Sequence, residues 1–155
     1  ELAEQYRLPR PIIDIIREHH GTSAMTYFLA KAQERGELLN EADYRYSGPK
    51  PRSKESAIIL LADSVEAAVK ALSDPTPEQI ERIVREVISA KIADGQLDDA
   101  PLTLQEIQEI QRAFIDTLKS IYHHRIEYPK VAPTRPAEQN GIVPLLKASR
   151  KANGQ

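Results

Sequence analysis

Two adjacent histidines, His19 and His20, stand at the end of an apolar helical pattern, immediately before Gly21. Imidazole nitrogens bind iron, manganese and similar ions, so the pair is a candidate metal-binding element. Neighbouring residues of a helix point about 100° apart, so both rings approach one site only where the helix end loosens. The alternative is a surface pair stabilised by the negative end of the helix dipole. The residues alone leave both interpretations open.

Asp63 is a further candidate for a functional residue. It lies in the segment "AIILLADSVEAA" (residues 57–68), which is apolar nearly all round and predicts a central, buried helix. A carboxylate in such surroundings has a large desolvation cost unless a partner compensates its charge. The partner is an arginine or lysine, a hydrogen-bond network or a metal ion, and the pattern does not decide between them.

A second histidine pair, His123 and His124, stands near the end of the last predicted helix. No buried carboxylate is predicted near this pair. We interpret both residues as structural.

Composition limits the classes of function. The chain has 155 residues and a formal charge of -2, which disfavours a binder of polymeric nucleic acid, since such proteins are usually basic. It has no cysteine, so any metal must be held by nitrogen and oxygen ligands. No apolar run reaches the roughly 18 residues of a membrane-spanning helix. Because the first residue is Glu1 and not Met, we expect a piece of a longer protein.

Prolines and glycines divide the chain into helical segments, and no strand-like alternation interrupts them, which predicts an all-α fold with about five helices. The first helix has isoleucines spaced for burial within residues 12–20 and ends at Gly21. Thr22 or Ser23 is the expected cap of the second helix. Residues 37–53 form a long loop, and loops of that length are usually functional or disordered.

Three further helices have clear capping signals: Ser53 for the first, Thr76 with Pro77 for the second, and Thr103 with Glu106 for the third. Two of these helices have apolar stripes with a period of 3.6 residues. The stripe of the second consists of Ile80, Ile83, Val84, Val87, Ile88 and Lys91. The stripe of the third consists of Leu104, Ile107, Ile110, Phe114, Leu118 and Ile121. Beyond Pro129, residues 130–155 predict an extended or disordered tail.

Three phrases occur in an order typical of one family: "EHHGT" (18–22), "DYRYSGPKPRSKESAIILLADSVEAA" (43–68) and "PTPEQIERIVREVISAKIADGQLDDAPLTLQEI" (75–107). From about residue 10 to residue 129 the chain resembles the back half of the HD-domain phosphohydrolase of seven-transmembrane HD proteins of the PgpH type. The resemblance implies that residues 1–129 form part of an HD-domain-like helical bundle. It also implies a bacterial membrane-anchored phosphodiesterase with a cytoplasmic catalytic domain that hydrolyses cyclic di-AMP to pApA with two divalent ions, manganese or iron.

The resemblance also implies roles for individual residues. The family's paired histidines fall on His19 and His20, and its closing aspartate falls on Asp63, which makes these three residues metal ligands. Four basic residues around the long loop are expected to meet phosphate, and two tyrosines to stack on adenine. These residues are Arg45, Lys50, Arg52 and Lys54, and Tyr44 and Tyr46. For the loop residues, ordinary solvated positions are the alternative interpretation.

The chain departs from the family pattern in one respect. The His-Asp dipeptide and the earlier histidine ligands of the family lie upstream of "EHHGT", whereas this chain has no such dipeptide and no histidine before His19. We therefore expect an incomplete metal site and no activity for the chain alone. The upstream half of the HD domain and the membrane portion of the same protein are its expected partners. Apolar surface left without that cover is also compatible with a homodimer.

Two other functions remain open. The helices of residues 77–94 and 103–125 would also suit a non-catalytic regulatory or interaction module that docks partner helices. An HD phosphohydrolase acting on another nucleotide is the second alternative, since fold does not fix substrate. As a ligand, Asp63 should face the same cavity as His19 or His20. As a structural residue, it should be paired with a basic side chain.

Overall fold

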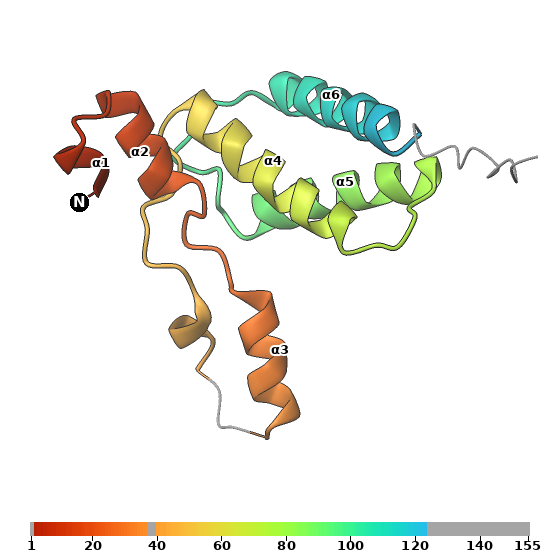
Figure 1. Ribbon diagram of the computed structural model, residues 1–155, viewed down its shortest axis with the longest axis horizontal. Coiled ribbons are helices and arrows are strands. Elements are labelled where there is room, and N and C mark those ends of the chain that lie inside the picture. The colour runs from red at the N-terminus through yellow and green to blue at the C-terminus, as the bar shows by residue number, and fades with distance from the viewer. Residues whose placement is uncertain (1, 37–39, 124–155) are drawn as a thin grey trace, which may run out of the picture. The chain divides into compact units, whose positions relative to one another are not determined.

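The computed structural model describes residues 2–36 and 40–123. Within these ranges the regular elements are helices, and no strand is present apart from one isolated bridge, which confirms the all-α prediction (Figure 1). The elements are α1 (Leu2–Gln5), α2 (Arg10–Glu18), α3 (Thr26–Glu34), the 3-10 helix η1 (Glu41–Tyr44), α4 (Lys54–Lys70), α5 (Pro77–Ala93) and α6 (Leu104–His123). Among the described helices, none has the length and apolar character needed to cross a membrane.

Two expectations fall outside the described residues. The predicted tail of residues 130–155, with its boundary after residue 129, is one of them, and His124 is the other. The side chain of His123 is likewise not described.

The three long helices begin where their capping residues predict. The Ser53 hydroxyl accepts the Ser56 N–H at 3.1 Å at the start of α4. Thr76 and Gln79 form a reciprocal capping box at the start of α5, with Pro77 in its first turn. In the same way, Glu106 accepts from the Thr103 N–H at 2.9 Å, and the Glu106 N–H donates to the Thr103 hydroxyl at 3.2 Å.

Helices α4, α5 and α6 enclose the core, in which α5 packs on both of the others (Figure 1). The predicted stripe of α5 supplies Ile80, Val84 and Ile88 as fully buried side chains. The stripe of α6 is only partly as predicted, because Leu104 and Ile121 are 77% and 60% exposed. The buried side chains of α6 are Ile115, which is next to Phe114 of the predicted stripe, and Leu118.

The N-terminal segment corrects two sequence predictions. Of the four isoleucines of α2 only Ile13 is buried, while Ile12 and Ile16 stay exposed, because α2 packs on α4 along one side. The next helix, α3, begins at Thr26, so neither Thr22 nor Ser23 is its cap. The Ser23 carbonyl instead accepts the Tyr46 N–H at 3.0 Å, in the isolated antiparallel bridge between residues 24 and 45.

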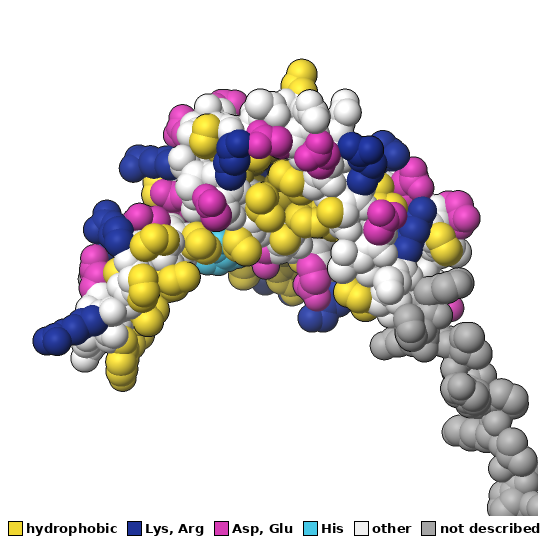
Figure 2. Space-filling view, turned by 90° about the horizontal axis from the view of Figure 1, so that it is seen from above, with side chains coloured by type: hydrophobic (Ala, Val, Ile, Leu, Met, Phe, Trp, Pro, Cys, Tyr) yellow, Lys and Arg dark blue, Asp and Glu magenta, His cyan; other side chains and the backbone are white. Residues whose placement is uncertain are grey.

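The predicted burial of Asp63 is wrong for the part of the chain that the structure describes. Its side chain is 50% exposed. Helix α4 buries Leu60, Leu61 and Val65 on one side, and the helical period places Asp63 nearly opposite them. Ile59 is exposed on that outer side too. Figure 2 shows apolar side chains (yellow) gathered in the middle of one face, and exposed histidine atoms (cyan) are visible beside them.

Candidate metal and phosphate site

The end of α2 presents both histidines to the same region. His19 is the C-cap residue, and its N–H donates to the Ile15 carbonyl at 2.9 Å. His20 follows in the turn, and Gly21 reverses the chain with a φ of +55°, a conformation that side chains with a Cβ rarely adopt. The two imidazole rings lie with centroids 4.0 Å apart. The change of chain direction at Gly21 therefore leaves the two rings side by side at the end of α2.

The ring of His19 is oriented by its own helix. Its Nδ1 lies 2.9 Å from the Ile16 carbonyl oxygen. A carbonyl can only accept, so Nδ1 is the protonated nitrogen and Nε2 is the free acceptor. A backbone carbonyl that fixes the tautomer in this way is typical of metal-binding histidines.

His20 faces Asp63 across the gap between the end of α2 and α4. The His20 Nδ1 lies 3.7 Å from the Asp63 Oδ2, and both side chains are partly exposed. The Tyr46 ring stacks on His20 with centroids 4.3 Å apart and planes 15° from parallel. Burial lowers the pKa of His20, the charge of His19 acts in the same direction, and Asp63 opposes both. The neutral imidazole favoured by this balance is the form that binds metals.

His20 and Asp63 line an open groove of about 720 Å³. Its walls come from α4, α5, the start of α3 and the loop around Arg45 and Tyr46. Its polar lining comprises His20, Ser23, Thr26, Arg45, Asp63, Ser64, Lys91 and Asp94. The groove thus brings two of the three predicted ligands, His20 and Asp63, together with basic and aromatic side chains, whereas His19 is not among its lining residues.

A buried glutamine holds the turn that presents His20. Gln96 is fully buried, and its Oε1 accepts the Thr22 N–H at 2.9 Å. Its Nε2 donates to the Thr22 hydroxyl at 3.0 Å and to the Asp94 carboxylate at 2.9 Å. A Cβ added to Gly21 would lie 2.4 Å from the Gln96 Oε1, so this close packing requires glycine. Gln96 therefore joins the histidine turn to the end of α5.

Arg45 lies on the groove, but neighbouring groups already occupy its guanidinium. Nη1 and Nη2 bind the two carboxylate oxygens of Asp94 at 3.1 and 2.9 Å. Nη1 also donates to the Thr22 carbonyl at 3.0 Å, and Nη2 to Glu41 at 2.7 Å. The hydrogen bond from Arg45 lowers the pKa of Asp94 and keeps that carboxylate charged. These contacts indicate that Arg45 stabilises the loop that contains Tyr46.

The other loop candidates lie away from the groove lining. Lys50 pairs with Asp98 at 3.3 Å, and Lys54 pairs with Glu106. Tyr44 lines a smaller pocket beside α3. Of the six loop residues predicted to meet substrate, the structure brings only Arg45 and Tyr46 to the groove that contains His20.

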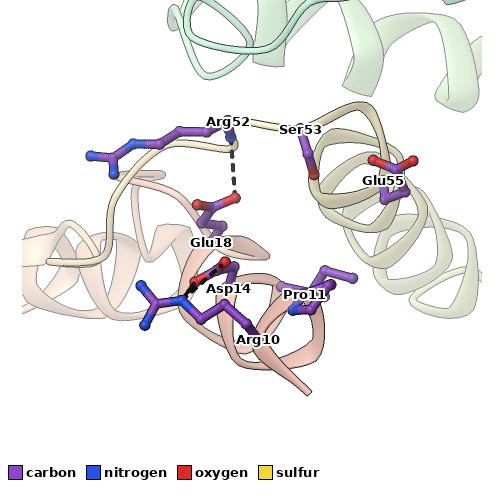
Figure 3. A pocket seen from close by; sticks show the side chains of 8 residues that line it. Arg10, Pro11, Asp14, Glu18, Arg52, Ser53 and Glu55 are labelled. Carbon is purple, nitrogen blue, oxygen red and sulfur yellow. Dashed lines mark hydrogen bonds and ion pairs between the residues drawn. The ribbon is translucent and has the colours of Figure 1, made fainter. Parts of the chain in front are cut away.

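Arg52 belongs to a separate cavity of about 590 Å³ between α2 and the start of α4 (Figure 3). The buried Glu18 carboxylate accepts the Arg52 N–H at 3.1 Å there, and Asp14 pairs with Arg10 at 3.0 Å (Figure 3). These contacts fasten the end of the loop to the helix that bears the histidines. Because Glu18 and Arg52 join two segments of the chain there, we interpret this cavity as structural.

The described residues supply only part of a metal site. The donors fit divalent iron or manganese, since they are imidazole nitrogens and a carboxylate. Among the described residues, however, no three histidine, aspartate or glutamate side chains come together as a binding cluster. The sequence interpretation also missed Ser23, Asp94 and Gln96. Lys91 was noted only as a member of the α5 stripe, where a charge among apolar residues is an unusual feature.

Comparisons with known proteins agree on one relationship, although no protein-family profile matches the chain. The cyclic-di-AMP phosphodiesterases PgpH of Bacillus subtilis (strain 168) and of Listeria monocytogenes serotype 1/2a (strain 10403S) are each 48% identical to it over 129 residues. That alignment covers 83% of this chain, which spans 18% of the length of each relative. The L. monocytogenes PgpH HD domain, crystallised in complex with cyclic-di-AMP, has a TM-score of 0.74 at 46% identity, covering 78% of this chain and 56% of that one.

Proposed function

The chain is a homologue of part of the HD domain of the PgpH proteins, and on this premise we propose that it contributes to the active site of a cyclic-di-AMP phosphodiesterase. The proposed reaction is metal-dependent hydrolysis of cyclic di-AMP to linear pApA. The proposed setting is the cytoplasmic domain of a bacterial integral membrane protein. The relatives named PgpH and the crystallised complex with cyclic-di-AMP support the choice of substrate.

One observation carries the proposal. His20 and Asp63, which come from different elements, face each other at 3.7 Å on one groove. Among the described residues, the basic side chain within 4 Å of Asp63 is this histidine, not an arginine or lysine. A purely structural aspartate would be expected to have a basic partner, so the arrangement favours the ligand role over the non-catalytic module.

His19, His20 and Asp63 would hold two divalent ions, manganese or iron, together with ligands from the rest of the HD domain. Bound there, such ions activate water and neutralise the phosphodiester charge. The chain's own residues have supporting roles. The Ile16 carbonyl orients His19, and Tyr46 packs on His20. The side chain of Asp63 is half exposed, which leaves room for metal ligands from the rest of the HD domain.

The upstream half of the HD domain is the proposed cover for the outer side of α4. Ile59 on that side is exposed, as are Ile12 and Ile16 of α2, and exposed apolar groups of this kind favour a packing partner. With three ligands at most, the chain alone should be inactive. Adding manganese or ferrous iron to the purified chain and following cyclic di-AMP tests this point, and turnover at the rate of the complete HD domain would contradict it.

The main test uses the protein with its complete HD domain. Asp63→Ala should abolish manganese-dependent conversion of cyclic di-AMP to pApA while the far-UV circular dichroism stays unchanged, because Asp63 is outside the core. Glu66→Ala is the matched control, since Glu66 lies one turn further on the same helix and pairs with Lys70 at 3.5 Å. Full activity of the Asp63 variant would remove this residue from the ligand set. Hydrolysis of another nucleotide in place of cyclic di-AMP would overturn the proposed substrate.

A further inference from the structure

Lys91 is a basic residue on the otherwise apolar stripe of α5. Its side chain is partly buried and reaches the groove lined by His20 and Asp63. Its Nζ donates to the hydroxyl of the buried Ser23 at 2.7 Å. An ammonium group has three hydrogens to donate, so one such bond leaves capacity for another acceptor.

The charge of Lys91 is not matched by a carboxylate in direct contact among the described residues. Burial lowers the pKa of Lys91, and the charges of Asp94 and Asp63, both beyond ion-pair distance, oppose this shift only in part. A cation drawn partly out of water without a paired anion is unfavourable by itself. Two nearby carboxylates offset part of this cost, and the contact with Ser23 fixes the position of the ammonium group. A cation in this position is suited to bind an anionic ligand.

The other basic residues of this region differ in this respect. Asp94 and Glu41 compensate Arg45, while Asp98 compensates Lys50. Lys91 is therefore the lysine of the described groove lining whose ammonium remains available for a ligand.

We propose that Lys91 binds a non-bridging oxygen of the substrate phosphodiester, with Ser23 holding its ammonium in place. This inference rests on the proposed function and adds a residue to its substrate-binding set. The groove supplies the geometry: Asp63 and His20 line it from α4 and the α2 turn, and Lys91 lines it from α5. A phosphodiester seated at the metal ligands would bring one oxygen to the unpaired ammonium. The resulting charge-assisted hydrogen bond is of the strong kind.

The test compares Lys91→Gln and Lys91→Arg with the wild-type protein carrying its complete HD domain. The probes are cyclic di-AMP and bis(4-nitrophenyl) phosphate, a phosphodiester without a base. With manganese present, Lys91→Gln should raise KM for both probes on the order of tenfold to a hundredfold. Manganese content and Tm should stay unchanged, and the dependence of KM on salt should weaken. Lys91→Arg should restore part of the affinity. Lys70→Gln is the control, because Lys70 is exposed on α4 and pairs with Glu66.

Each outcome decides the question. Unchanged KM and salt dependence in Lys91→Gln would overturn the proposal. Loss of manganese or a lower Tm in Lys91→Gln, if Lys91→Arg does not restore it, would assign Lys91 a structural role. That result would also overturn the proposal. If the wild-type protein hydrolyses the base-free diester but not cyclic di-AMP, the proposed substrate fails while Lys91 is still judged with that diester. If the wild-type protein hydrolyses neither probe, the proposed function fails and the role of Lys91 falls with it.

Discussion

Gln96 and Thr22, 74 residues apart in the chain, exchange hydrogen bonds in both directions. The glutamine amide accepts from the threonine backbone and donates to its hydroxyl, at 2.9 and 3.0 Å. The pair ties the turn after the two histidines to the end of α5. The geometry of the histidines therefore depends on a residue far from them in sequence.

Gln96→Ala should destabilise the protein on the order of 1–3 kcal/mol, because Thr22 N–H and Asp94 would lose a buried partner. Chemical denaturation measures the change. Gln105→Ala is the control, since Gln105 is exposed and bonds to Glu109 within one helix. Equal stability of both variants would show that the Gln96 bonds contribute little.

Gly21→Ala should be more damaging than Gly36→Ala, although both glycines have positive φ. Each substitution incurs the backbone cost of a left-handed conformation, roughly 1–2 kcal/mol. Only at Gly21 would the new Cβ also collide with Gln96, whereas nothing lies within 4 Å at Gly36. Thermal unfolding should therefore give a larger Tm decrease for Gly21→Ala. Similar decreases would contradict the close packing of the turn.

His20→Ala should lower the affinity of the complete HD domain for manganese. Metal that binds only the folded state raises Tm, so the Tm gain on adding manganese measures affinity without any assay of activity. The wild-type protein should show a clear gain, and His20→Ala a smaller one. Glu66→Ala should behave as the wild type. An undiminished gain in the His20 variant would argue against its role as a ligand.

Arg45 and Asp94 should show coupling in a double-mutant cycle of Arg45→Gln and Asp94→Asn. Both side chains are about one-third exposed, so solvent screening reduces the coupling to about 1 kcal/mol even for a bidentate pair. Denaturant unfolding of the two single variants and the double variant gives the value. Strict additivity would mean that the pair does not hold the loop at Tyr46.

Glu106 should contribute to the loss of stability in acid. Hydrogen bonds from Lys54 and from the Thr103 backbone lower its pKa to about 2 from an ordinary 4.5. As pH falls, the unfolded chain takes up this proton before the folded one does, which favours unfolding. The contribution of Glu106 is thus complete above pH 4.5 and is lost as pH falls toward 2.

The Glu106→Gln variant should accordingly show a weaker pH dependence of unfolding free energy in that interval. Glu109→Gln is the control, because Glu109 is exposed and accepts from the neutral Gln105. Matching pH profiles for Glu106→Gln and the wild type would contradict the prediction.

The starts of α4, α5 and α6 follow from local signals. Ser53, Thr76 and Thr103 satisfy the free N–H groups of the first turn with their own side chains, so neighbouring residues suffice to predict them. Gly21 is likewise predictable, since a turn that leaves a helix end in the left-handed region favours glycine. The start of α3 was mispredicted because Thr22 and Ser23 bond to distant partners and not to the next helix.

The candidate ligands were named from the sequence by family resemblance, together with the residue types that suit a metal. What only the tertiary structure decided is their surroundings: Asp63 is half exposed, Arg45 is already paired, and Lys91 reaches the groove. Periodicity shows that a helix has an apolar side, but it does not show how much of the helix its neighbours cover. Cover and charge pairing arise from contacts between segments dozens of residues apart, and those contacts form only when the chain folds.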